Sequence, residues 1–340
     1  MTRFFWGLTL LGVTIAPGLN SLFLPLTRNN HVLSAPSPDL SKDSLLLFLA
    51  ETENILLSQN KPNHPPEVDG FQSLMEYAQK EKLSQHSMSE IIYRLTGYFL
   101  GTPYQEGLLD QFQEETLYVS LKGFDCVLFV ETVLAIAQGV AVQDYSYQTL
   151  LKNIESLRYV NGDLQGYCSR LHYFSDWIED NKSRGKVENI TGKLGGVFLN
   201  KKLNFISHHR GSYPQLVEDK NYQCIVQREQ KLASLPFHFI PTNQIKSIYA
   251  QLKPGDIIAV ATNIEGLDFT HTGFVYQNDD NTMGFIHASP IGKVTIARDL
   301  SQYIARVDNA IGIVVVRALD PRLKNHLTPD FKNNYGRKNE

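Results

Sequence analysis

The chain has 340 residues, 42% of them hydrophobic, and a formal net charge of −3. This length allows one elaborated domain or two modest ones. Lys and Arg do not gather in a long run, so neither a nucleic-acid surface nor a patch for anionic membranes is supported. We expect neither class of partner, and composition alone names no function.

The N-terminus has the layout of a secretory signal. Arg3 precedes an apolar stretch from Phe4 to Ala16, and Pro17 and Gly18 follow. The apolar run is shorter than the ~20 residues that a membrane-spanning helix needs. We predict export to the periplasm or the extracellular space, with residues 1–35 as signal and processing region. No stable membrane span is expected after signal removal, and retention by an uncleaved N-terminal anchor is the alternative.

The next segment, residues 36–85, is predicted to be a helical extension and linker. Residues 44–57 are helix-like, and the Pro-rich residues 61–66 (KPNHPP) are typical of a linker. We place the main domain at 86–320 and a polar C-terminal tail at 321–340.

Two helices are predicted early in the main domain. The first begins near Ser87, which has capping-box spacing with Glu90, and ends at Gly101. The second runs from about 125 to 138 and ends at Gly139. It is apolar nearly all round, which indicates a buried helix.

The rest of the domain changes character twice. Residues 144–239 are polar and irregular, with helix-like stretches at 150–157 and 169–181. The last third contains short β-rich runs separated by turns, typical of a meander of antiparallel strands: 256–260, 271–276, 284–288, 294–297 and 311–317. Helices followed by a small antiparallel sheet, with helical and loop insertions, indicate an α+β fold.

The three cysteines are too few to build a fold on disulfides. In an oxidising compartment an odd count leaves one thiol free or intermolecular. Cys126 stands at the first turn of the buried helix, where backbone N–H groups and the helix dipole favour negative charge. We therefore expect a lowered thiol pKa and a nucleophilic thiolate. Asp125 can cap this helix end, although its charge opposes the thiolate. Cys168 and Cys224 either form a disulfide or remain buried, inert thiols.

A thiolate needs a partner that holds its charge and later protonates the leaving amine, and histidine does both near neutral pH. His271 is expected at the start of a strand, and His287 lies on the next predicted strand. Adjacent antiparallel strands in the right register bring two imidazoles within hydrogen-bond distance, so His287 could orient His271. The alternative is that Cys126 and the two histidines are ordinary core residues.

The irregular middle contains the segment RLHYFSDW. Helical spacing puts Tyr173 and Trp177 on one face, with Arg170 beside them. This segment is either an amphipathic packing helix or a source of substrate contacts, from Arg170 or Asp176, at the rim of the site.

His208 and His209 invite a metal interpretation. Adjacent histidines on a strand point to opposite faces, so they cannot easily share one ion. We predict no zinc site, and no cofactor is required.

Six segments occur in order between Leu100 and Pro290: LGTPY, FDCVLFVETVLA, RLHYFSDWI, KPGDIIAV, GLDFTHTGFV and HASP. Together they resemble the N-acetylmuramoyl-L-alanine amidase-like family of NlpC-related bacterial cysteine hydrolases, which has a papain-like α+β fold. The resemblance spans about Ser87 to Leu319. The chain has Leu128 where a small hydroxyl residue is expected, and Pro290 where serine often follows, but neither change touches the catalytic matches.

The resemblance implies that Cys126 is the nucleophile, His271 the general base and His287 the orienting third residue. It implies hydrolysis of the amide between the lactyl group of N-acetylmuramic acid and L-alanine, without a metal. Tyr104 matches a tyrosine that lines the site, and the backbone N–H of Cys126 would be one oxyanion donor. Further substrate contacts are expected from Asp125, Arg170, Tyr173, Asp176, Trp177, Asp268 and Ser289.

Three other functions remain open. One is a stem-peptide endopeptidase that cuts between D-Glu and the diamino acid. The second is a non-catalytic wall-binding module with a decayed site, and the third is a zinc amidase. We expect a monomer whose substrate is either the intact wall or its soluble fragments.

Overall fold

The computed structural model describes residues 68–233 and 237–326, and the predicted signal region, the helix at 44–57 and the linker at 61–66 lie outside these ranges. Eight strands form one sheet in the order β2-β3-β8-β4-β5-β6-β7, with β1 beside β8. The strands are β1 Val187–Asn189, β2 Val197–Leu199, β3 Phe237–Pro241, β4 Ile257–Thr262, β5 Phe269–Gln277, β6 Met283–Ala288, β7 Val294–Ala297 and β8 Ala310–Ala318.

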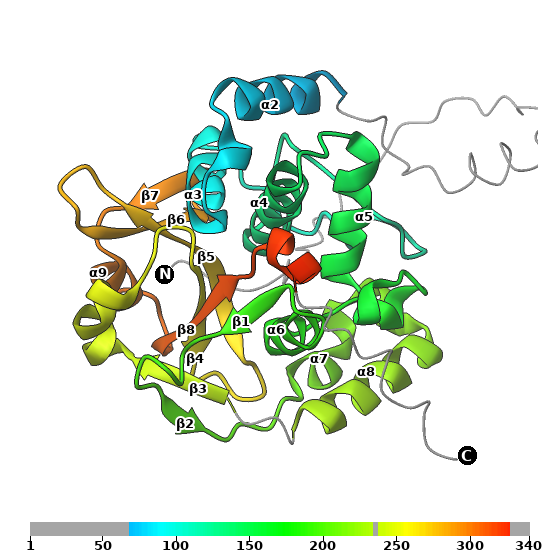
Figure 1. Ribbon diagram of the computed structural model, residues 1–340. Helices are drawn as coiled ribbons and strands as arrows, with labels where there is room; N and C mark the ends of the chain where they lie inside the picture. The colour runs from blue at the N-terminus through cyan, green and yellow to red at the C-terminus, as the bar shows by residue number, and fades with distance from the viewer. Residues whose placement is uncertain (1–67, 234–236, 327–340) are drawn as a thin grey trace, which may run out of the picture. The chain divides into compact units, whose positions relative to one another are not determined.

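Helices precede, interrupt and follow these strands (Figure 1). The α-helices are α2 Val68–Lys80, α3 Met88–Tyr98, α4 Cys126–Ala141, α5 Tyr147–Arg158, α6 Phe174–Ser183, α7 Phe205–His208, α8 Asp219–Leu232 and α9 Leu300–Ile304. The 3-10 helices are η1 Leu83–Gln85, η2 Val160–Gly162, η3 Tyr167–Ser169, η4 Arg210–Ser212, η5 Pro214–Val217, η6 Thr242–Gln251 and η7 Pro321–His326.

The antiparallel sheet confirms the predicted strand runs and extends them. Strands β4 to β7 form the predicted meander, and β8 returns to pair with β4. Strands β1, β2 and β3 come from the irregular middle, where the sequence predicts no strand. Two of them have three residues each, which is too short for an alternating pattern, and they are extended because β8 and β3 supply pairing partners.

The first two predicted helices are confirmed as α3 and α4. The Ser87 hydroxyl caps α3 by accepting a hydrogen bond from the N–H of Glu90. Helix α4 is buried along almost its whole length, as predicted, but it continues through Gly139 to Ala141. A Cβ at Gly139 would lie 2.9 Å from the Asp144 carbonyl oxygen. The glycine therefore permits a close approach of the following loop and does not end the helix.

Both faces of the sheet are covered at β4, whose six residues are all buried. Ile257 and Ala259 join the core beneath α3 and α4. Ile258 and Val260 join a second core with residues of η6 and α9. Figure 1 shows α4 and α9 on opposite sides of the sheet. A strand covered on both faces explains the unbroken apolar run in the sequence.

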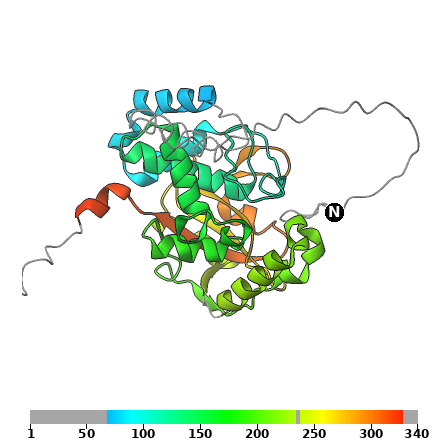
Figure 2. The same cartoon turned by 90° about the vertical axis from the view of Figure 1, so that its right-hand side faces the viewer.

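Helix α2 and η1 pack on the same core as α3 and α4 (Figure 2). Leu74, Ala78 and Leu83 are fully buried there. The later part of the predicted 36–85 extension is thus docked on the domain, and the sequence left open whether it docks or only tethers.

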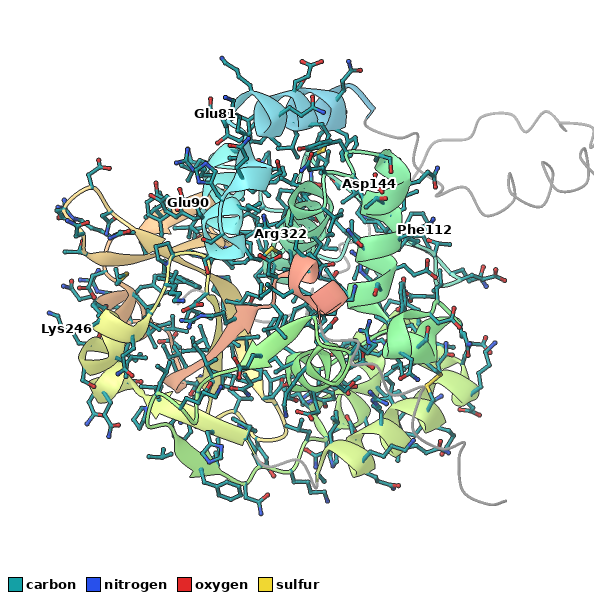
Figure 3. The ribbon with its side chains drawn as sticks, in the orientation of Figure 1. Glu81, Glu90, Phe112, Asp144, Lys246 and Arg322 are labelled. Atoms are coloured by element: carbon teal, nitrogen blue, oxygen red, sulfur yellow. A yellow bond between two sulfur atoms is a disulfide. The ribbon has the colours of Figure 1, made fainter. Side chains whose placement is uncertain are left out.

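The beginning of the predicted C-terminal tail is also docked. Arg322, labelled in Figure 3, donates hydrogen bonds to the carbonyl oxygens of Ser84 (2.7 Å) and His86 (2.9 Å). The bounds 86 and 320 stay predictions, with ordered structure on either side of each.

The helix predicted at 169–181 begins later than the spacing suggests. Helix α6 starts at Phe174, with Tyr173 as its N-cap, and Arg170 precedes it in extended conformation. The Leu171 N–H donates to the Arg158 carbonyl oxygen (2.9 Å), which holds this segment beside the end of α5. The prediction that Arg170 shares a helix face with Tyr173 is therefore wrong. The helix predicted at 150–157 is confirmed within α5.

Candidate active site

Cys126 is the first residue of α4, as predicted, and is 6% exposed. The Asp125 carboxylate caps the helix by accepting hydrogen bonds from the N–H groups of Val127 (2.9 Å) and Leu128 (2.8 Å). Asp at an N-cap satisfies donors that have no partner within the helix. The cap therefore fixes where the helix starts and which residue stands at its first position.

The surroundings of the Cys126 sulfur act on its pKa in opposite directions. Burial raises the pKa of the thiol, and the neighbouring Asp125 carboxylate raises it further. The backbone N–H groups of Thr272, Cys126 and Val127 lower it. Burial outweighs these N–H groups, so the prediction of a lowered thiol pKa is wrong. The sequence showed the helix start but not how completely the sheet covers it.

His271 and His287 form a hydrogen-bonded pair. The His271 Nε2 and His287 Nδ1 atoms are 2.7 Å apart, and the two side chains are almost fully buried. The register pairs Phe274 of β5 with Ile286 of β6, which makes the two histidines diagonal neighbours on one face. This is the register that the sequence analysis required.

A glycine allows the strands to approach each other at this pair. A Cβ at Gly273 would lie 2.5 Å from the Ile286 carbonyl oxygen and 2.8 Å from the His287 Cβ. Such distances are too short for non-bonded atoms, so a side chain at this position would displace β6 and His287 with it.

The two imidazoles are neutral in this environment. Burial lowers the pKa of His271 to about 3. Burial and the neighbouring His271 lower the pKa of His287 well below its ordinary value. With the thiol pKa raised, the resting site holds a neutral thiol beside neutral imidazoles. Within the described residues no hydrogen bond joins the sulfur to an imidazole. The sulfur instead contacts the backbone N–H of Thr272, which directly follows His271 on β5.

Two tyrosines lie close to the thiol. Burial and the proximity of Cys126 raise the pKa of Tyr104, and the same two causes raise the pKa of Tyr303. The Tyr104 N–H donates to the Gly292 carbonyl oxygen (2.8 Å), in the loop that also contains the predicted site residue Ser289. Tyr104 thus lies close to the thiol, and its role in the site stays a prediction.

Sequence reasoning missed Tyr303, which lies on the short helix α9. The missed signal is a capping pattern in the sequence Asp299-Leu300-Ser301-Gln302, in which the Asp299 carboxylate accepts a hydrogen bond from the Gln302 N–H (2.8 Å). An acidic N-cap with Gln three residues later marks a helix start. That start directs the first turn of α9, and Tyr303 with it, toward the histidines.

A cavity of about 120 Å³ opens beside the first turn of α4. Four predicted site residues line it, namely Asp125, Arg170, Tyr173 and Asp268. Its other lining residues include Val127, Glu131, Arg158, His172 and Tyr213. The cavity is smaller than the pockets of several hundred Å³ that usually hold drug-sized ligands.

Charged groups in the cavity wall are paired or hydrogen-bonded. Arg158 Nε donates to Glu131 Oε2 at 2.8 Å, and both side chains are buried. Arg170 Nη2 donates to Asp110 Oδ1 at 2.8 Å. Asp268 accepts hydrogen bonds from the N–H groups of Ser175 and Phe269, and burial raises its pKa. These pairings keep the wall rigid.

The cavity lining does not include the predicted catalytic residues Cys126, His271 and His287, nor Tyr104, Asp176, Trp177 and Ser289. Asp176 forms a two-fold hydrogen-bonded ion pair with Arg228, with both oxygens 2.5 Å from guanidinium nitrogens. Trp177 is 1% exposed and stacks on Phe174 with ring centroids 4.9 Å apart. Of the two interpretations open from the sequence, packing describes these two side chains.

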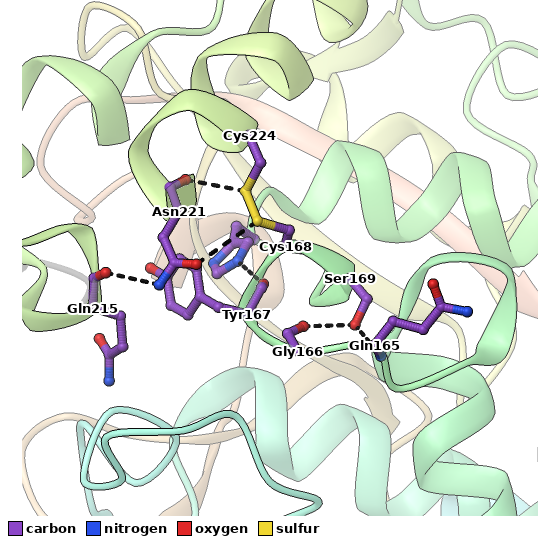
Figure 4. The surroundings of a disulfide bond; sticks show 9 residues. Gln165, Gly166, Tyr167, Cys168, Ser169, Gln215, Asn221 and Cys224 are labelled. Atoms are coloured by element: carbon purple, nitrogen blue, oxygen red, sulfur yellow. Dashed lines mark hydrogen bonds between the residues drawn. A yellow bond between two sulfur atoms is a disulfide. The ribbon is translucent and has the colours of Figure 1, made fainter. Parts of the chain in front are cut away.

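Cys168 and Cys224 form a disulfide (Figure 4). It ties η3 to α8. The Nε2 of the cavity residue His172 donates a hydrogen bond to the carbonyl oxygen of Tyr167 (2.9 Å), the residue before Cys168. Cys126 is the one cysteine that remains free. The disulfide therefore braces the segment that carries part of the cavity wall.

His208 and His209 lie at the end of α7 and not on a strand, which corrects the geometry assumed for them. Their Nδ1 atoms are 2.8 Å from the Asn204 carbonyl oxygen and 2.7 Å from the Phe205 carbonyl oxygen, respectively. Within residues 68–233 and 237–326, no group of three or more His, Cys, Asp or Glu residues is arranged to hold a metal ion. No helix of these ranges is long and apolar enough to span a membrane.

Comparison with known proteins identifies a protein family that matches most of the described chain. A family model described as AmiA-like, N-acetylmuramoyl-L-alanine amidase-like, matches residues 94–313. No curated protein matches the chain.

Solved structures also resemble the chain. An N-acetylmuramoyl-L-alanine amidase from Bacteroides uniformis is 29% identical, with a TM-score of 0.65 over 68% of this chain and 98% of that one. A protein described as a putative xylanase from Bacteroides fragilis is 30% identical, with a TM-score of 0.59 over 66% of this chain and 99% of that one. A Legionella pneumophila protein at 24% identity, with a TM-score of 0.56 over 74% of this chain and 95% of that one, shares the fold.

Proposed function

Because the chain belongs to the N-acetylmuramoyl-L-alanine amidase-like family, we propose that it is a cysteine hydrolase that cleaves the amide between N-acetylmuramic acid and L-alanine. The family model and the amidase from Bacteroides uniformis support a peptidoglycan amidase at family level. One observation supports the cysteine mechanism most directly. The free thiol at the start of α4 lies against β5, the strand that carries His271 of the imidazole pair.

The proposed reaction proceeds by acyl transfer. The Cys126 thiol gives its proton to His271, and the sulfur attacks the lactyl carbonyl carbon to form a tetrahedral adduct. The C–N bond then breaks, and His271 returns the proton to the leaving L-alanine nitrogen. Water attacks the resulting thioester while His271 takes one of its protons, and cleavage of the C–S bond releases the lactyl acid and restores the thiol. His287 holds the His271 ring in place throughout.

The negative charge on the carbonyl oxygen of each adduct needs hydrogen-bond donors. The N–H of Cys126 lies at the start of α4, where helix N–H groups lack intrahelical acceptors. The hydroxyl of Tyr104, close to the sulfur and kept protonated by burial, is a second donor. Donors fixed before the reaction are effective because they need not reorganise as charge develops.

The cavity beside Asp125 and Val127 is proposed as the site for one residue of the stem peptide. The sugar would then lie on the open side, toward Tyr104 and the loop of Ser289.

We further propose the NlpC-related, papain-like superfamily for the fold and an exported location for the protein. The antiparallel sheet with a cysteine at a preceding helix start supports the first proposal. The Cys168–Cys224 disulfide supports the second, because disulfides persist in oxidising compartments.

Product identification tests this function. Purified protein is incubated with a muramyl-tripeptide, and the products are identified by mass spectrometry. We expect free peptide that begins with L-alanine, together with the lactyl acid of the sugar. Release of the diamino acid, with L-Ala–D-Glu still attached to the sugar, would identify an endopeptidase instead.

Three variants test the mechanism. Cys126→Ala and His271→Gln should each abolish peptide release, while His208→Gln, a change of an exposed histidine outside the site, should leave it intact. Activity retained in Cys126→Ala would exclude the thiol as the nucleophile. Activity lost to a chelator in the unmodified protein would point to a zinc amidase.

A further inference from the structure

Two aromatic rings cover the imidazole pair. Phe285 of β6 stacks on His287 with centroids 4.9 Å apart and an interplanar angle of 14°. The Tyr303 ring lies 4.7 Å from the His287 ring and 6.3 Å from the His271 ring. Phe285 and Tyr303 also contact each other, with centroids 5.2 Å apart. We call Phe285 and Tyr303 the aromatic cover.

The imidazole pair has no acidic partner. Within the part of the chain that the structure describes, neither a hydrogen bond nor an ion pair joins His271 or His287 to a carboxylate. Burial lowers the pKa of both histidines, and the neighbouring His271 lowers the pKa of His287 further. Nevertheless, the proposed reaction requires a positive charge on this pair each time His271 takes a proton. A buried positive charge without a partner is costly, so another group must stabilise it.

We propose that Phe285 and Tyr303 are positioning residues that stabilise the protonated imidazole pair through the electron-rich faces of their rings. The face of an aromatic ring attracts a cation whose centre lies within about 6 Å, most strongly where water is excluded. Phe285 is fully buried, and its near-parallel stacking places the His287 ring over its face. The hydrogen bond between the histidines extends the stabilisation to His271, because it shares the charge between them.

The location of Tyr303 is consistent with this role. The proximity of Cys126 contributes to its raised pKa, so its ring lies near both the nucleophile and the base. Tyr303 is therefore a neighbour of both groups between which the proposed proton transfer takes place. The inference rests on the proposed function, since the charge arises only if His271 acts as the base.

Fluorination at Phe285 tests the inference with little change of shape. Phe285 is replaced in turn by 4-fluoro-, 3,5-difluoro- and 3,4,5-trifluorophenylalanine, which progressively withdraw electron density from the ring face. Phe71 receives the same series as a control. It is also buried, but it packs edge-on against Tyr147 and not on an imidazole. Melting temperatures confirm that each variant is folded.

Two rates are measured for each variant. The first is kcat for release of the stem peptide, and the second is alkylation of Cys126 by iodoacetamide at neutral pH, which needs no peptidoglycan substrate. We expect both rates to fall stepwise along the Phe285 series, by about fivefold to thirtyfold at trifluorophenylalanine. KM should stay constant, because the charge arises after binding. The Phe71 series should stay flat.

The outcomes separate the two proposals. Rates that do not change along the Phe285 series, or that change equally along the Phe71 series, would overturn the role of the aromatic cover while the amidase function stands. Failure of the unmodified protein to release peptide would overturn the proposed function, and the alkylation series would still test the aromatic cover. Tyr303 is also replaced by phenylalanine and then by the same fluorinated phenylalanines. Both rates should fall along this series, and rates that do not change would remove Tyr303 from the proposal.

Discussion

Breaking the buried ion pair between Glu131 and Arg158 should destabilise the fold strongly. Glu131 lies on α4 five residues after Cys126, and both members of the pair are 2% exposed at their side chains. The Arg158 guanidinium also donates from Nη1 to the Tyr118 carbonyl oxygen at 2.6 Å. Arg158→Met leaves the Glu131 carboxylate buried without its ion-pair partner, and Glu131→Met leaves the buried guanidinium without a carboxylate to offset its charge. Each should lower the free energy of unfolding by about 3–5 kcal/mol.

The double variant Glu131→Met/Arg158→Met should be much closer to the unmodified protein than the sum of the two single changes. It buries apolar groups of similar length and leaves no charge without a partner, so the coupling between the sites should exceed about 2 kcal/mol. Because a folded protein has a net stability of about 5–15 kcal/mol, each single variant loses a large share of it.

Urea unfolding followed by circular dichroism measures these effects. The exposed ion pair between Glu90 and Arg94 is the control, with side chains 34% and 37% exposed and a shortest N–O distance of 2.6 Å. Arg94→Met should cost at most about 0.5 kcal/mol. If the two buried single variants each cost less than about 1 kcal/mol, or their effects simply add, the desolvation argument is wrong.

Three further predictions follow from the same physical arguments. Reduction of the Cys168–Cys224 disulfide, whose residues are 56 apart in sequence, should lower the free energy of unfolding by about 4 kcal/mol. Thermal unfolding of the Cys126→Ala variant with and without reductant checks this value. Asp125→Asn should keep the helix cap but remove the charge that raises the pKa of the Cys126 thiol, so iodoacetamide should alkylate this thiol faster. Asp125→Ala also removes the cap and should lower the free energy of unfolding by about 1 kcal/mol. Burial lowers the pKa of His271 from its ordinary 6.5 to about 3 and that of His287 well below 6.5. Between these values the unfolded chain binds protons that the folded chain does not. The free energy of unfolding should therefore fall as the pH drops from about 6.5 toward 3. Replacing both histidines with glutamine should flatten this decline in an acid titration of stability, and an unchanged decline would show that other groups cause it.

Local patterns in the sequence were sufficient to locate the elements that carry the candidate site. Apolar periodicity and capping residues located α3 and α4, because a cap and a buried face are local properties. Short β-rich runs separated by turns located β4 to β8 for the same reason. Cys126 at a helix start and histidines on consecutive strands could therefore be named before any coordinates.

The structure of residues 144–239 could not be predicted in detail, because it depends on contacts with residues that are distant in the sequence. Arg170 is extended because its segment pairs beside the end of α5. Asp176 forms an ion pair with Arg228, which lies 52 residues away in the sequence. The short strands β1 and β2 exist only through pairing with β8 and β3. No local pattern encodes such contacts.

The amino-acid sequence by itself thus determined the helix start at Cys126, the two histidines on consecutive strands, the α+β order and the family. Tertiary structure alone decided the protonation of the site, the disulfide and the aromatic cover. Burial sets the pKa values of Cys126 and His271, and burial results from the packing of α4 and α9 against opposite sides of the sheet. The contact of Tyr303 with His287 joins a helix and a strand through packing alone. Such contacts depend on three-dimensional distance, which residue types and spacing do not specify.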